Sequence, residues 1–183
     1  MKKIILLVAA VWFITEFPLL AGTMAEQAIL TDLDSPQYKV VLNALAHFED
    51  DHRDSAPAMA KVKALLADLR PPVREKAARV LGAIHADVSE DDLKNITTML
   101  SSPEKHEVIQ ALKALRGLKA GSTVPKIVPL LQNPGENIKR DSCRTLAVIG
   151  SKGNIKDIEP LLKDPDKAVV EDAQKAIAAL NVK

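Results

Sequence analysis

Four basic residues recur along the chain at intervals of 31 to 34 residues, namely Arg79, Lys113, Arg144 and Lys175. Cations at a repeating interval fall on the same side of successive structural units, where they could bind an extended acidic peptide or another anionic polymer. Arg140 lies one helical turn before Arg144, and Arg116 lies three residues after Lys113. The sequence therefore predicts a basic binding surface that is strongest around these two pairs.

The same row can also be interpreted as an ordinary solvated surface. Two of its members have a glutamate four residues earlier, the spacing at which ion pairs form along a helix: Glu75 before Arg79, and Glu171 before Lys175. Such pairs would neutralise part of the row. We expect Arg140 and Arg144 to be the unneutralised part, and we expect their replacement by glutamate to abolish partner binding without lowering thermal stability.

Catalytic chemistry has little support in this chain. There is no phosphate-cradling glycine loop, nucleophile elbow, Cys-x-x-Cys or His-Glu-x-x-His motif, and the only cysteine is Cys143. A single cysteine excludes an intramolecular disulfide. We therefore predict that the protein is not an enzyme, and we interpret Cys143 as a small buried hydrophobe.

One segment combines residue types that can ligate a divalent metal. Residues 47–54 contain His47 and His52 together with four carboxylates. The two histidines are five residues apart, which matches neither paired ligands on a helix nor a calcium loop. We interpret the segment as a solvated acidic loop and predict neither a metal nor a cofactor.

The elements that must position these side chains form an array of repeats. Five leucines, each seven residues ahead of a second marker, recur about every 31 to 34 residues: Leu33 with Val40, Leu66 with Val73, Leu100 with Glu107, Leu131 with Ile138, and Leu162 with Val169. A period of this length indicates a small unit that cannot bury its own apolar face and must stack on its neighbours. The aromatic content of 3% also favours closely packed helices over a β-sandwich.

Each unit carries two apolar stripes with helical spacing. The residue four before each leucine is apolar (Ile29, Val62, Ile96, Ile127, Ile158), and the residue four after each second marker is small (Ala44, Ala77, Ala111, Ser142, Ala173). A proline three residues after the leucine separates the two helices in four units: Pro36, Pro103, Pro134 and Pro165. The second unit has Leu69 there, so we expect its turn to differ in shape. Because Glu107 replaces the usual apolar marker, we expect its helix to be rotated or to start later.

These patterns predict five helix pairs. The expected units are 26–53, 54–88, 89–120, 121–152 and 153–183. The expected helices are 26–33 with 37–51, 55–69 with 72–86, 90–101 with 104–118, 122–132 with 136–149, and 154–163 with 167–181.

Two segments resemble HEAT-like repeats: Pro-Pro-Val-Arg-Glu-Lys-Ala-Ala-Arg-Val-Leu-Gly-Ala-Ile at 71–84, and Asp-Pro-Asp-Lys-Ala-Val-Val-Glu-Asp-Ala-Gln-Lys-Ala-Ile at 164–177. The short period is most similar to the subgroup first noted in phycobilisome lyases. Pro129 and Pro160 resemble the proline that often kinks the first helix of a HEAT unit. The resemblance covers residues 26–183 and implies an all-α, right-handed α-solenoid that serves as a binding scaffold. In such arrays the side that carries the basic row lines the concave face, so we expect the partner to bind there. Through the lyase association it also leaves open a lyase-like enzyme centred on Cys143.

The first 25 residues differ from the rest. Lys2 and Lys3 precede an apolar run, and the segment ends in Gly22-Thr23-Met24-Ala25, the pattern of a secretory signal peptide. Glu16 and Pro18 cut the run short of the roughly 20 apolar residues that a membrane-spanning helix needs. We expect cleavage after Ala25, with Ala21 and Gly22 as alternative sites, and a periplasmic or secreted mature chain that is not inserted in a membrane. Without cleavage the segment would anchor the chain to the membrane.

The charge of the mature chain limits its partners. Removal of the first 25 residues leaves 23 basic and 23 acidic residues. Nucleic-acid binders and anionic-membrane binders carry a basic excess, so we predict neither partner. Another protein or an acidic peptide remains as the expected partner.

Two apolar residues are expected on the same face as the basic row, Leu42 and Ile109. The first unit is apolar on nearly every side around Leu42, and such a helix is usually covered. Either the preceding segment of this chain covers it, or a partner or a second copy does. The full predicted binding set is Arg79, Lys113, Arg116, Arg140, Arg144, Lys175, Leu42 and Ile109. The alternative to a binding scaffold is a structural oligomer that assembles through the first repeat.

Overall fold

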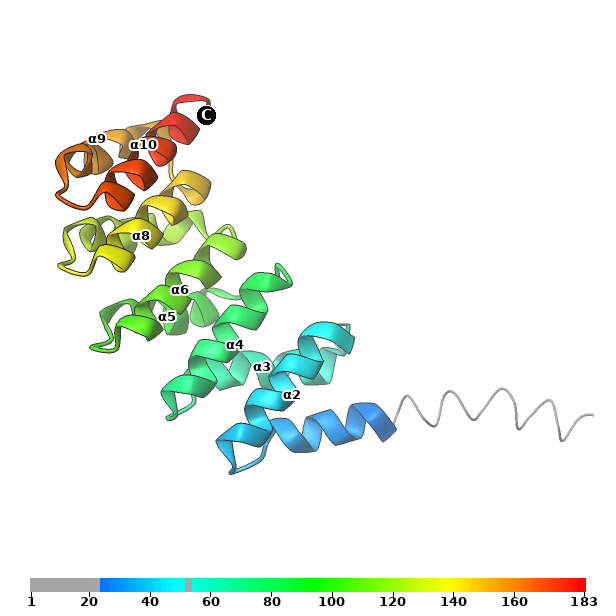
Figure 1. The fold of residues 1–183 in the computed structure, drawn as a ribbon. Coiled ribbons are helices and arrows are strands. Elements are labelled where there is room, and N and C mark those ends of the chain that lie inside the picture. Colours follow the sequence, from blue (N-terminus) through cyan, green and yellow to red (C-terminus); the bar gives the residue numbers. More distant parts are fainter. Residues whose placement is uncertain (1–23, 52–53) are drawn as a thin grey trace, which may run out of the picture. The chain divides into compact units, whose positions relative to one another are not determined.

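The structure is a computed structural model that describes residues 24–51 and 54–183 (Figure 1). Most of the expected signal segment, and His52, lie outside the described residues. The chain divides into two compact units, which meet in sequence between Lys61 and Val62. Within the described ranges all regular structure is helical. No helix among these residues is long and apolar enough to cross a membrane.

The first unit contains a helix at residues 24–33, then α2 (Tyr38–Asp51) and the start of α3 (Ala56–Ala64). Its buried apolar side chains are Ile29, Leu33, Val41, Ala44, Leu45, Phe48 and Ala58. Lys61 pairs with Asp34, and the hydroxyl of Ser55 donates a hydrogen bond to the carboxylate of Glu26. The segment that follows the expected cleavage site is therefore part of the folded unit.

The second unit is a stack of helix pairs. Its elements after α3 are η1 (Leu65–Ala67), α4 (Pro71–Ala83), α5 (Glu90–Thr98), η2 (Met99–Ser101), α6 (Lys105–Gly117), η3 (Gly121–Thr123), α7 (Val124–Ile127), η4 (Val128–Gln132), α8 (Glu136–Ile149), η5 (Lys152–Asn154), α9 (Ile155–Ile158), η6 (Glu159–Lys163) and α10 (Lys167–Asn181). The second helices α4, α6, α8 and α10 pack side by side in chain order (Figure 1). This arrangement confirms the predicted all-α solenoid, and the helices lie within a few residues of the expected ranges.

The two predicted stripes form the core. The first-helix stripe is buried throughout, with Val62, Ile96, Ile127 and Ile158 fully inaccessible. The small residues of the second helices are buried as well, including Ala77, Ala111, Ser142 and Ala173. One marker differs: Leu162 is 40% exposed, and its neighbour Leu161 is buried instead. Leu131, its counterpart one repeat earlier, lies in η4 and is buried, and η4 packs against α9 of the next repeat.

The two expected kinking prolines shorten the first helices of the last two repeats. Helix α5 runs for 9 residues before its 3₁₀ turn, whereas α7 and α9 each run for 4. Pro129 and Pro160 stand in η4 and η6 directly after these short helices. Proline has no N–H to donate to the carbonyl four residues earlier, so the helix tightens to a 3₁₀ turn at that point.

The turn between the helices of each repeat is built around one side-chain acceptor. This position accepts a hydrogen bond from the backbone N–H two residues later in all five repeats: Ser35, Asp68, Ser102, Asn133 and Asp164. The expected difference in the second turn is wrong, because Asp68 (φ −61°, ψ 143°) has nearly the dihedral angles of Ser102 (φ −65°, ψ 143°). The acceptor rather than the following proline defines the turn, and Leu69 is left 94% exposed.

Glu107 does not delay its helix. Helix α6 begins at Lys105, two residues before Glu107, just as α4 begins two residues before Val73. The Glu107 side chain is 2% exposed and pairs with Arg74 of the preceding repeat at 2.7 Å. Ser102 also donates a hydrogen bond to it at 2.7 Å. Burial of a charge is tolerated here because both carboxylate oxygens have partners.

Glycine allows α4 and α6 to approach closely. A Cβ atom at Gly82 would lie 2.7 Å from the Cα atom of Ala114, and one at Gly117 would lie 2.3 Å from the carbonyl oxygen of Gly82. Both distances are too short for any side chain, and the atoms concerned are backbone atoms that cannot rotate away. The contact between these two helices therefore depends on glycine at both positions.

We predict that Gly117→Ala destabilises the second unit, because α4 and α6 must move apart to admit the methyl group. Overpacking of this kind costs about 1–3 kcal/mol, and we expect a lower thermal midpoint by circular dichroism. Gly153→Ala is the matched control, since a Cβ there would meet its nearest atom at 3.6 Å. Equal midpoints for both variants and the wild type would contradict the proposed role of Gly117.

Candidate functional site

All the basic residues of the predicted surface lie on the second helices of the second unit. Arg79 is on α4, Lys113 and Arg116 are on α6, Arg140 and Arg144 are on α8, and Lys175 is on α10. Lys113, Arg144 and Lys175 are exposed, and the other three are half-buried. Because these helices are neighbours, the structure brings the cations of α6, α8 and α10 onto adjoining surfaces.

Asp172 on α10 is the centre of the strongest charge cluster. Arg140 Nε donates to Asp172 Oδ2 at 2.8 Å, and Arg144 Nε donates to Asp172 Oδ1 at 3.1 Å. Arg144 Nη2 lies 2.9 Å from Asp172 Oδ2. We call this set, Arg140, Asp172 and Arg144, the arginine clamp. It joins two consecutive repeats across their interface.

The prediction that Arg140 and Arg144 are unneutralised is wrong, because both arginines pair with Asp172. Asp172 is buried, with 6% of its surface exposed. Burial alone would raise its pKa, but the hydrogen bonds from Arg140 and Arg144 outweigh that effect and hold the pKa below its usual value. Reversal of both arginine charges would place two glutamates against this buried carboxylate. The prediction that replacement of Arg140 and Arg144 by glutamate leaves thermal stability unchanged therefore does not fit the structure.

Asp141 occupies on α8 the repeat position that Asp172 occupies on α10, but its distances to arginine are longer. Its Oδ1 atom lies 3.7 Å from Arg116 Nη1 and 4.0 Å from Arg144 Nη1. This oxygen is buried and has no hydrogen-bond partner among the described residues. Sequence reasoning missed both aspartates, although a signal was present: each lies three residues after the second marker of its repeat, Ile138 or Val169.

The remaining members of the row differ in their charge partners. Lys175 pairs with Glu171 at 2.6 Å, as the four-residue spacing predicted. Glu75 contacts His106 of the next repeat at 2.6 Å. Lys113 is exposed and forms no ion pair with the described residues. Around α6, α8 and α10 the surface thus combines five cations with three carboxylates, Asp141, Asp172 and Glu171.

A pocket lies within this basic surface. It has a volume of about 430 Å³ and is lined by Arg116, Arg144, Ala147, Asp172, Lys175 and Ala176. The two alanines leave space between the charged side chains. This pocket is called the basic pocket below.

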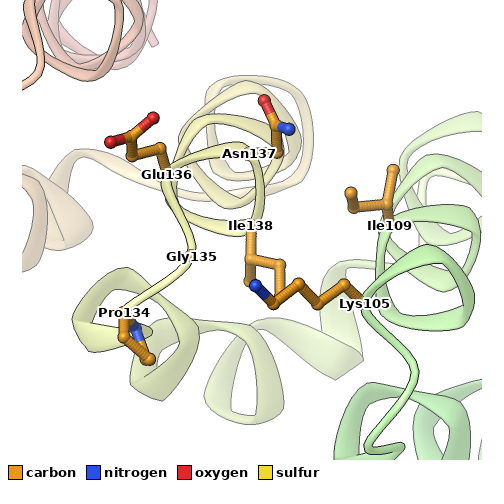
Figure 2. Close-up of a pocket in the computed structure, with 7 residues that line it drawn as sticks. All are labelled: Lys105, Ile109, Pro134, Gly135, Glu136, Asn137 and Ile138. Atoms are coloured by element: carbon orange, nitrogen blue, oxygen red, sulfur yellow. The ribbon is translucent and has the colours of Figure 1, made fainter.

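Ile109 belongs to a different hollow. It lines a pocket of about 300 Å³ between the first turns of α6 and α8, together with Lys105 and residues 134–138 (Figure 2). Figure 2 shows Ile109 and Lys105 on the α6 side, facing Asn137 and Ile138 on α8. Leu42 is half-buried on α2 in the first unit, so it is described apart from the basic surface.

Cys143 lies on the buried side of α8, in the core of the second unit. Its side chain is fully inaccessible, and burial raises the pKa of its thiol to about 12. A thiol with such a pKa remains protonated at neutral pH, which removes its nucleophilic character. Elsewhere, the described part of the chain has no cluster of three histidine, cysteine, aspartate or glutamate side chains that could hold a metal.

Known proteins of the same fold include repeat proteins of two kinds. A chain of the CpcE–CpcF complex of phycocyanin lyase from Nostoc aligns with a TM-score of 0.72 and 20% identity, over 86% of this chain and 65% of the lyase chain. A designed armadillo repeat protein, solved with the peptide (KR)4, aligns with a TM-score of 0.70 and 19% identity, over 90% of this chain and 85% of the designed one. No family model and no curated protein sequence matches. This chain therefore has the fold of a HEAT-like repeat α-solenoid.

We predict that Asp172→Asn reduces the acid sensitivity of the fold. Because the folded-state pKa of Asp172 is depressed, its contribution to stability is present above its unfolded pKa of about 3.9 and is lost as pH falls through the lower folded value. Urea midpoints measured between pH 6 and pH 3 should fall for the wild type and fall less for Asp172→Asn. Identical pH dependence in the two proteins would show that the clamp adds no stability.

We predict that Cys143 does not react with an aromatic disulfide reagent in the native protein at neutral pH, and reacts fully in denaturing urea. The reason is its complete burial together with the raised pKa of its thiol. Rapid native labelling, followed by absorbance, would instead indicate an accessible thiolate.

Proposed function

We propose that the protein is a non-catalytic protein-binding scaffold of the cell envelope, which binds an acidic segment of a partner on the second-helix surface of its second unit. The observation that carries the proposal is the basic pocket, where Arg116, Arg144 and Lys175 surround a space of about 430 Å³. Helical repeat arrays bind partners along such extended surfaces. Electrostatic complementarity would then select an acidic partner.

The designed armadillo repeat protein of the same fold supports a peptide or protein partner, because it was solved with a peptide of alternating lysine and arginine. The choice of charge comes from this chain, where cations outnumber carboxylates on the second-helix surface of α6, α8 and α10. A partner segment rich in aspartate and glutamate fits this surface.

The likeness to phycocyanin lyase supports a lyase-like activity less well. At 20% identity it concerns the fold, and this chain spans 65% of the lyase chain. The one candidate nucleophile, Cys143, is buried with a raised thiol pKa. A binding role without covalent chemistry is therefore the better supported function.

Export of the chain is part of the proposal. The pattern of residues 1–25 supports it, and so does the position of the expected cleavage site. Met24 and Ala25 are exposed, and the first core side chain after them is Ile29. Cleavage after Ala25 would leave the core of the first unit complete. The amino-terminal sequence of the protein recovered from a periplasmic fraction tests this directly, and an intact Met1 would contradict it.

The binding test uses affinity capture from a cell-envelope extract with the chain lacking residues 1–25. We predict that Lys113→Glu with Lys175→Glu loses a partner that the wild type retains. Both side chains are exposed and neither belongs to the arginine clamp, so this variant should keep its thermal midpoint.

Lys126→Glu with Lys156→Glu is the matched control. These residues are exposed on the first helices α7 and α9, away from the second-helix surface. Retention of the same partner by the wild type and both variants would refute the basic surface. A dimer or larger species of the truncated wild type in light scattering, with no partner captured, would favour the alternative of self-assembly through the first repeat.

A further inference from the structure

The cations at the basic pocket differ in whether a carboxylate of this chain already binds them. Arg144 is already engaged, with Nε and Nη2 directed at Asp172. Arg140 is engaged by the same carboxylate. Asp172 thus has both of its oxygens occupied and can accept little more from these two side chains. Two members of the arginine clamp, Arg144 and Asp172, line the pocket and are already bound to each other.

Arg116 is in a different state. Its nearest carboxylate atom is Asp141 Oδ1 at 3.7 Å, which is beyond hydrogen-bond length. Within the described structure no hydrogen bond from its guanidinium is present, although this group has five N–H donors. The buried Asp141 oxygen attracts Arg116 without binding it. Arg116 is therefore oriented at the pocket with its donors unused.

Lys175 borders the same pocket and is also available. Its single ion pair is with Glu171, and the two side chains are 68% and 64% exposed. Exposed pairs of this kind contribute little free energy and exchange readily with another anion. The ammonium group can turn toward the pocket at low cost.

From these contacts we infer that the basic pocket is a carboxylate subsite, in which Arg116 and Lys175 contact an aspartate or glutamate side chain of the partner, beside the Arg144–Asp172 pair that also lines the pocket. This inference rests on the proposed function and assigns roles within its surface. A carboxylate matches the planar donor pair of a guanidinium. The equal numbers of basic and acidic residues in the chain after residue 25 disfavour a long polyanion, which would need a broad basic excess.

The test measures binding of a fluorescently labelled octaglutamate peptide by anisotropy at low salt, with an octaglutamine peptide as the neutral comparison. The wild type should bind octaglutamate and not octaglutamine. Arg116→Ala and Lys175→Ala should each weaken binding, by about tenfold for Arg116 because a charge-assisted hydrogen bond is lost. Arg116→Lys should recover part of the affinity, since it restores the charge without the planar donor pair.

Lys126→Ala is the control, because it removes an exposed cation from α7 and leaves the pocket intact. Thermal midpoints of all variants, measured alongside, separate lost binding from lost folding. Equal loss in Lys126→Ala, or unchanged affinity in Arg116→Ala and Lys175→Ala, would overturn the subsite. Binding of polyphosphate without binding of octaglutamate would overturn it as well.

The two proposals fail separately. If envelope capture depends on Lys113 and Lys175 but the wild type does not bind octaglutamate, the scaffold function stands and the carboxylate subsite is wrong. If octaglutamate binds through Arg116 while capture is the same for every variant, the subsite stands and the proposed partner surface is wrong.

Discussion

The interaction on which the rest of the second unit depends is the close packing of its second helices. Each helix pair leaves one apolar face uncovered, and only the next pair can bury it. The small residues Ala77, Ala111, Ser142 and Ala173 permit this approach, and Gly82 and Gly117 bring α4 and α6 into backbone contact. The spacing of every surface residue follows from this packing, including the spacing of the basic row.

Charged side chains lie across the same interfaces. Arg74 reaches Glu107 in the next repeat, Arg140 and Arg144 reach Asp172, and Lys139 reaches Asp164. These pairs are partly shielded from water, so removal of one partner would leave a charge without compensation. Two cations of the candidate surface, Arg140 and Arg144, therefore have a structural role, whereas Arg116 and Lys175 are the ones that we assign to a ligand.

The last repeat differs from the others in the residue at the position that corresponds to Cys143. The position of Cys143 is occupied by buried residues in other repeats, Leu45, Ala78 and Leu112, whereas α10 carries the exposed Gln174 there. The exposed Leu162 belongs to the same repeat. The residue type at the position of Cys143 therefore follows its burial: it is apolar where the side chain is buried and polar where it is exposed.

The architecture of the chain could be predicted from its amino-acid sequence. Apolar residues recur with a helical period and the whole pattern recurs every 31 to 34 residues, so helix pairs, their approximate ends and the buried stripes follow from local propensity and burial. The tertiary structure decided the state of the charges. Arg140 and Arg144 donate hydrogen bonds to Asp172, which lies 32 and 28 residues later. Arg116 Nη1 instead lies 3.7 Å from Asp141 Oδ1, too far for a hydrogen bond. Helical spacing reports only partners within one helix, such as Glu171 with Lys175. Whether a cation is bound or available depends on differences of less than 1 Å in the distances between side chains of neighbouring repeats, and these distances are set only when the helices pack.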